Sequence, residues 1–160
     1  MSGLVVDSSV FAKWILPEAD SVQAQRVFTE VAAKGERLVV LDLAYAEVAS
    51  ATWKRHRQKQ ISRSEADAFL KALLCCPVDV EEARRVINQA FEIAIQYDRA
   101  IYDALFVALV RDRAMPGITA DEPLVQRSPR SFSANHVAKE LAITATCLPE
   151  PRFTPAAGGR

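Results

Sequence analysis

Three acidic residues of this chain stand alone in apolar stretches of sequence. Asp7, Glu47 and Asp103 have no other charged residue within three positions on either side, and a fourth acid, Asp121, follows a short apolar run. An ionised carboxylate buried in such surroundings is unfavourable unless it gains hydrogen bonds, a basic partner or a cation, or becomes protonated. Because no Lys or Arg lies in these stretches, the four acids are the candidate functional residues.

Convergence of these acids would favour one kind of chemistry. Carboxylates brought to one point raise each other's pKa unless a divalent cation compensates their charge. Oxygen ligands favour Mg²⁺ or Mn²⁺, whereas His56 and His136 belong to no paired motif that would indicate zinc. Mg²⁺ held by a few carboxylates binds phosphate oxygens and activates water, so the pattern predicts phosphodiester hydrolysis.

Each acid also has an ordinary structural interpretation. Asp7 precedes Ser-Ser and could cap a helix, and Glu47 could lie on the exposed face of one. Asp103 could stabilise a helix dipole from the first turn, and Asp121 could belong to a surface turn. Their joint occurrence, in this order, favours the site.

The elements that must position the acids alternate between strands and helices. The pattern predicts strands at 4–6, 38–41, 75–80 and 117–119, and helices from 8 to Pro17 and at 21–34, 43–58, from 62 onward, 82–97 and 99–113. This alternation predicts a three-layer α/β/α sandwich with a central parallel sheet. Sites in such folds lie at the carboxyl ends of the strands, where Asp7 and Asp121 are expected.

Length and composition predict one domain over residues 1–148, with a disordered tail at 149–160. The 160 residues contain 20 Lys+Arg and 20 Asp+Glu, so no basic field recruits nucleic acid and any such contact must be local or metal-mediated. Neither a signal peptide nor a membrane span is expected. Cys75, Cys76 and Cys147 lack metal-ligand spacing and form no evident disulfide framework, which favours the cytoplasm.

Four short motifs together resemble the PIN-domain family, and more narrowly its VapC-type toxins. They are VVDSSVFAKWILPE, AEVASATWK, IYDALFVALV and ITADEPL, and the resemblance runs from about Val5 to Leu124. It implies a parallel sheet, an acidic pocket that binds Mg²⁺ or Mn²⁺, and endonucleolytic cleavage of RNA. It also implies homodimerisation and inhibition by a cognate antitoxin protein.

By matching position, the resemblance gives the family's conserved-acid roles to Asp7, Glu47, Asp103 and Asp121. Asp7 and Asp103 are then expected as the main metal ligands, with Asp121 assisting, and Glu47 is expected to orient or deprotonate water.

Several neighbouring residues are expected to support the acids. Thr119 and Ser8 are candidates to hydrogen-bond a carboxylate that holds the metal and so to fix its orientation, although they could equally be a strand residue and a helix cap. Ala100 departs from the Ser or Thr cap frequent in the family before the third motif, so Asp98 is expected to cap that helix instead.

A basic segment follows the second acid on the same helix. Lys54, Arg55 and Arg57 are candidates to guide an RNA backbone toward the acids. A solvated basic helix end that complements the helix dipole explains them equally well.

Other interpretations of the whole chain stay open. Phe11 and Trp14 make the first helix apolar, which fits core packing better than an antitoxin groove. A PIN-fold module that holds RNA, or another protein, without cutting is the main alternative to the nuclease. A phosphoacceptor resembling response regulators fits less well, since Asp7 lacks an acidic neighbour.

Overall fold

The fold alternates strands and helices as predicted. A computed structural model describes residues 3–18, 20–121 and 143–144. Its elements are β1 (Gly3–Val6), α1 (Ser8–Ile15), α2 (Ser21–Ala33), β2 (Arg37–Leu41), α3 (Leu43–Arg57), α4 (Arg63–Leu74), β3 (Asp79–Glu81), α5 (Ala83–Tyr97), α6 (Ile101–Arg113), β4 (Gly117–Ile118) and β5 (Ile143–Thr144).

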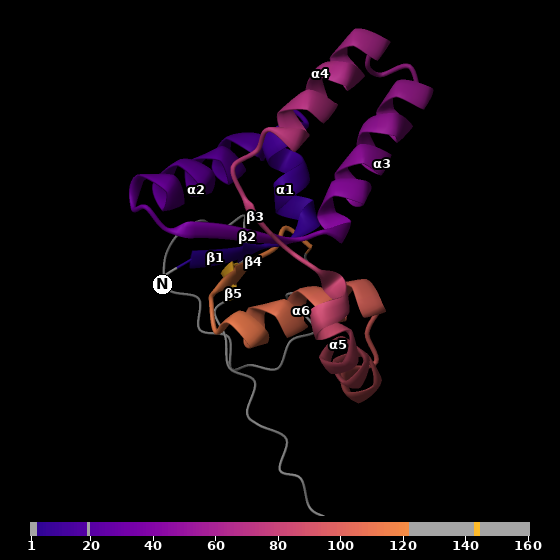
Figure 1. The fold of residues 1–160 in the computed structure, drawn as a ribbon. Coiled ribbons are helices and arrows are strands. Elements are labelled where there is room, and N and C mark those ends of the chain that lie inside the picture. The colour runs from indigo at the N-terminus through magenta and orange to yellow at the C-terminus, as the bar shows by residue number, and fades with distance from the viewer. Residues whose placement is uncertain (1–2, 19, 122–142, 145–160) are drawn as a thin grey trace, which may run out of the picture.

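The strands form one sheet in the order β3-β2-β1-β4-β5. The first four strands of this order are parallel, and β5 pairs antiparallel with β4 at the edge. Helices α1 to α4 lie on one face of the sheet and α5 and α6 on the other (Figure 1). The predicted three-layer α/β/α sandwich with a central parallel sheet is confirmed, with one antiparallel edge strand added.

Alternating side chains of β1 hold the three layers together. Leu4 and Val6 belong to a buried cluster with α1 to α4, whereas Val5 belongs to a cluster with Phe106 and Leu109 of α6. Successive side chains of a strand point to opposite faces, so a short apolar run buried on both faces serves both helical layers. This burial fixes β1, and with it the position of Asp7 at its end.

The predicted helix ends are largely confirmed. Ser62 caps α4, where its hydroxyl accepts the Glu65 N–H at 3.2 Å and the Glu65 carboxylate accepts the Ser62 N–H at 2.7 Å. α1 ends before Pro17, which cannot continue a helical hydrogen-bond ladder. Phe11 of α1 is fully buried, with edge-on ring contacts to Trp14 and Tyr45, so the apolar side of this helix is core.

Two local predictions were wrong. The strand expected at 75–80 begins only at Asp79, because Cys75 caps the end of α4 and Pro77 has no N–H to donate to a sheet. Asp98 does not cap α6: with φ of 48° it ends α5 in a left-handed conformation, and Ala100 is the N-cap residue of α6, without a side-chain hydrogen bond.

A glycine lets β4 lie directly against α6. A Cβ atom added at Gly117 would lie 2.6 Å from Val110 and 2.8 Å from Phe106, closer than packed carbon atoms approach. This close contact brings the segment after β4 toward the start of α6, where Asp103 lies.

Some expectations concern residues that the structure does not describe. The boundary at residue 148, the tail at 149–160 and Cys147 lie outside the described ranges. Cys75 and Cys76 are free thiols. Within residues 3–18, 20–121 and 143–144, no helix is both long and apolar enough to span a membrane.

Candidate active site

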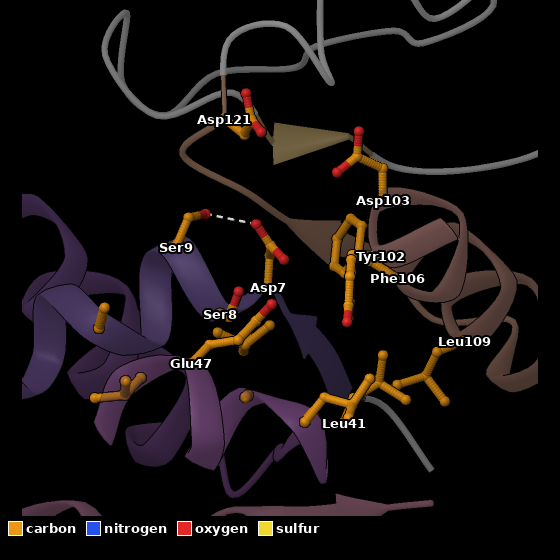
Figure 2. A pocket seen from close by; sticks show the side chains of 15 residues that line it. Asp7, Ser8, Ser9, Leu41, Glu47, Tyr102, Asp103, Phe106, Leu109 and Asp121 are labelled. Carbon is orange, nitrogen blue, oxygen red and sulfur yellow. Dashed lines mark hydrogen bonds between the residues drawn. The ribbon is translucent and has the colours of Figure 1, made fainter. Parts of the chain in front are cut away.

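All four predicted acids line one pocket at the carboxyl ends of the strands. Asp7, Glu47, Asp103 and Asp121 border a cavity of about 330 Å³. They come from four separate places: the end of β1, the helix α3, the first turn of α6 and the segment after β4 (Figure 2). Although 40 residues or more separate the first three acids in sequence, the fold brings them together.

The Asp7 carboxylate is held by hydrogen bonds from two hydroxyl groups and does not cap the helix α1. Its N–H donates to the Ile118 carbonyl at 2.9 Å, which extends the pairing of β1 and β4. Its carboxylate makes no hydrogen bond to the backbone of α1. Instead, Oδ2 accepts from the Ser9 hydroxyl at 2.6 Å and from the Thr119 hydroxyl at 2.7 Å. The helix-cap alternative for the Asp7 side chain is therefore wrong.

The two hydroxyls also connect Asp7 to the segment that carries Asp121. Ser9 Oγ accepts the Ala120 N–H at 3.0 Å, and Thr119 Oγ1 accepts the Asp121 N–H at 3.1 Å. Thr119 is fully buried, so these bonds are shielded from water. The network orients the Asp7 carboxylate and fixes the backbone at Asp121 relative to it.

The prediction for Thr119 and Ser8 holds for one residue only. Thr119 makes the expected hydrogen bond to a pocket carboxylate. Ser8 lines the pocket, but the serine that donates to Asp7 is Ser9. Two consecutive serines look alike in the sequence, and only the direction in which α1 leaves β1 decides which of them faces Asp7.

Asp103 shows that the acids influence one another. Burial raises the pKa of its carboxyl most, followed by the negative charge of Asp121; nearby Arg99 partly opposes this rise and Asp7 adds to it. Asp103 lies in the first turn of α6, as its ordinary interpretation required, yet it also borders the pocket. Figure 2 shows Asp7, Asp103 and Asp121 around a common space.

Glu47 differs from the other acids because it is exposed. The prediction that Glu47 is buried in apolar surroundings was therefore wrong, and the ordinary interpretation of Glu47 as an exposed helix residue is correct. The same side chain nevertheless lines the pocket, on the other side of Asp7 from Asp121 (Figure 2). An exposed carboxylate at the rim can contact water and still face the site.

The donor set suits a hard divalent cation. The acids offer only oxygen ligands, and no Lys, Arg or His is found among the described residues that line the pocket. Burial is the main cause of the raised pKa of Asp103, and the negative charges of Asp121 and Asp7, which a cation would compensate, add to it. Within the described residues, however, no three His, Cys, Asp or Glu side chains are close enough to form a ready metal site. The residues therefore fit a cation by chemistry, and binding would require their side chains to draw closer.

The basic residues after Glu47 have different environments. The Arg55 guanidinium donates to the Pro17 carbonyl at 3.0 Å and to Glu18 at 2.7 Å, so it joins α3 to the end of α1. Arg57 lies over the exposed Trp53 ring at 5.3 Å, and Lys54 is exposed. Arg55 thus has a structural role, which leaves Lys54 and Arg57 as the accessible pair.

Comparison with known proteins agrees with this fold and shows the family. A family model described as PIN domain matches residues 4–128, so the chain belongs to the PIN domain family. Within that family the chain is similar to Ribonuclease VapC3 of Pyrobaculum aerophilum, at 33% identity over 128 residues, which cover 79% of this chain and 95% of that protein. The predicted PIN-domain, VapC-type resemblance is confirmed.

Two solved structures share the fold. PAE2754 from Pyrobaculum aerophilum superposes with a TM-score of 0.62 at 20% identity, covering 79% of this chain and 80% of that one. VapC20 from Mycobacterium tuberculosis, a toxin that cleaves the sarcin–ricin loop, superposes with a TM-score of 0.59 at 19% identity, covering 78% of this chain and 94% of that one. Both likenesses support the arrangement of layers seen here.

Proposed function

We propose that this protein is a Mg²⁺- or Mn²⁺-dependent endoribonuclease that hydrolyses RNA phosphodiester bonds. The observation that carries the proposal is the convergence of Asp7, Asp103 and Asp121 from three elements on one pocket. The similarity to Ribonuclease VapC3 along almost the whole length of that protein supports RNA as the substrate.

We assign a different role in hydrolysis to each group of pocket residues. Asp7 and Asp103, assisted by Asp121, would hold the cation, which supplies charge neutralisation at the phosphate and activation of water. Ser9 and Thr119 keep the Asp7 carboxylate in one orientation. Glu47, exposed at the rim, would orient a water molecule or accept its proton.

A cleavage assay tests this proposal. Purified protein is expected to cut RNA in Mg²⁺ and to stop in EDTA, and Asp7→Asn is expected to lower the rate by roughly 100-fold or more, as loss of a charged transition-state contact does. Glu92→Gln changes an exposed acid of α5, outside the pocket, and is the matched control. RNA that is bound but left intact by the wild-type protein would favour the silent RNA-binding alternative.

We propose further that the nuclease acts as the toxin of a type II toxin–antitoxin pair in the cytoplasm, inhibited by a cognate antitoxin protein. This role rests on the family resemblance. Induced expression of the wild-type chain is expected to arrest bacterial growth, whereas Asp7→Asn is not. Equal arrest by both proteins would separate growth inhibition from cleavage and contradict the proposal.

Homodimerisation, also implied by the resemblance, has a candidate surface on α5. Ile87, Phe91 and Ile95 are 42%, 58% and 64% exposed and recur every four residues, so they share one face. We propose that a second copy covers this face around a two-fold axis at Phe91. Antiparallel pairing then places Ile87 against the partner's Ile95, and exposed Arg84 against the partner's Asp98.

A further inference from the structure

The pocket that contains the acids has a second, apolar half. Besides the four carboxylates, its lining includes Leu41, Phe106 and Leu109. Figure 2 shows Asp7, Asp103 and Asp121 around one side of the space, and Leu41 and Leu109 on the opposite side. Phosphate and cation suit the acidic side, whereas the apolar side offers them no ligand. The apolar half therefore suits an uncharged group.

Tyr102 stands between the two halves. It precedes Asp103 in the first turn of α6, and its side chain is 62% exposed. Phe106 lies one turn further along the same face of the helix and is only 5% exposed. The same helix face thus carries a packed aromatic ring and, at the pocket, a large aromatic ring left open to solvent.

The Tyr102 hydroxyl points away from the acids. Figure 2 shows the side chain extending toward Leu41, with its oxygen on the apolar side of the pocket. The hydroxyl is therefore badly placed to move a proton at the acid cluster. The flat ring, in contrast, borders the space next to Asp103, where it can contact a planar group.

We propose that Tyr102 and the apolar wall form a binding site for one nucleobase, adjacent to the phosphate that is hydrolysed at the acids. This inference rests on the proposed function and names the part of the substrate that the second half of the pocket takes. A cavity of about 330 Å³ suits a single small ligand group such as one nucleotide, not a folded strand. Base stacking on an aromatic ring tolerates any base, because every base has a flat π face.

A comparison of two ligands isolates the contribution of the base. Binding of a nucleoside 5′-monophosphate and of ribose 5-phosphate is measured with Mg²⁺ by ligand-detected NMR, for the wild-type chain and for Tyr102→Ala. The wild-type protein is expected to prefer the nucleotide by roughly 5- to 150-fold, the range that base–aromatic stacking gives. Tyr102→Ala is expected to lose most of this preference while its affinity for ribose 5-phosphate is unchanged.

Two further variants separate the ring from the hydroxyl and from general effects. Tyr102→Phe keeps the ring and is expected to retain the preference, and Leu74→Ala, at an exposed apolar site of α4 outside the pocket, is expected to behave as the wild type. Loss of the preference in Tyr102→Phe would assign the role to the hydroxyl and overturn the stacking proposal.

The outcomes also separate this inference from the proposed function. An unchanged nucleotide preference in Tyr102→Ala, together with RNA cleavage by the wild-type chain, refutes the base site and leaves the proposed nuclease activity intact. This result is expected if the exposed Tyr102 ring binds a partner protein instead of a base. A preference that depends on Tyr102 in a protein that cuts no RNA supports the base site alone. Equal or absent binding of both ligands by the wild-type protein refutes the base site.

Discussion

Replacing Thr119 with valine removes a buried hydroxyl that is hydrogen-bonded to the pocket residue Asp7 and keeps the shape of the side chain. Thr119 is fully buried, and its Oγ1 donates to Asp7 Oδ2 at 2.7 Å and accepts the Asp121 N–H at 3.1 Å. Both hydrogen bonds are lost in Thr119→Val, and no water replaces them without a rearrangement. The variant therefore tests whether the network orients the Asp7 carboxylate.

The stability cost follows from the two bonds. A hydrogen bond to a charged group contributes about 1.5–3 kcal/mol and a neutral one about 0.5–1.5 kcal/mol. We expect a loss of about 2–3 kcal/mol in the free energy of unfolding, near the low end, because Ser9 still donates to the same oxygen of Asp7. For a chain of this size the melting temperature should fall by about 4–12 °C.

The catalytic cost should be larger than this stability loss explains. Loss of a hydrogen bond that orients a metal ligand typically lowers activity or metal affinity roughly 10- to 100-fold. Thermal unfolding by circular dichroism and RNA cleavage in saturating Mg²⁺, at a temperature where the variant is folded, measure the two effects separately. Thr119→Ser keeps the hydroxyl and is the matched control, expected to cleave within a few-fold of the wild type. Wild-type cleavage by a destabilised Thr119→Val would refute the orienting role.

Three other predictions follow from the same structure. Burial, followed by the charge of Asp121, raises the pKa of Asp103 in the folded protein. The carboxyl is therefore harder to ionise in the folded than in the unfolded chain, so the free energy of unfolding decreases as pH rises above the ordinary carboxyl range. Asp103→Asn should therefore increase the free energy of unfolding at neutral pH in EDTA, and urea titrations should show the gain shrinking toward acid pH, where the carboxyl is protonated in both states; a gain that grows toward acid would refute this. Arg84→Glu and Asp98→Arg should each weaken the dimer in analytical ultracentrifugation, and the double variant should restore it; a double variant as monomeric as the singles would refute the pairing. Gly117→Ala should destabilise the fold by about 1–3 kcal/mol, because its Cβ meets buried α6 side chains at 2.6 and 2.8 Å, and an unchanged melting temperature would contradict that contact.

The placement of the acids around one pocket could be predicted from their positions in the sequence. Asp7 and Asp121 follow apolar strands, and parallel strands bring such positions to the same edge of a sheet. Asp103 stands alone in an apolar helix, and it is half-buried there, as this context implied. Periodicity and the capping residue Ser62 predicted the helices, because these signals are local.

Other features depend on contacts that no local pattern encodes. The choice of Ser9 over Ser8 depends on how α1 leaves β1, and the exposure of Glu47 depends on which face of α3 packs against the core, since its neighbours Ala44 and Val48 are the buried ones. Asp98 was predicted to start α6 but ends α5, since its left-handed backbone conformation outweighs the capping tendency of its side chain. Tyr102 showed no signal, because an aromatic residue in an apolar helix is ordinarily core.

The most direct test of the acid site is a crystal of the wild-type protein soaked with Mn²⁺. We expect an anomalous density peak among the carboxylates of Asp7, Asp103 and Asp121, with oxygen ligands at about 2.0–2.3 Å, as hard divalent cations require. The peak should disappear in Asp7→Asn crystals soaked in the same way. A Mn²⁺ ion bound elsewhere, or no ion at these acids in a protein that still cleaves RNA, would contradict the assignment of the site.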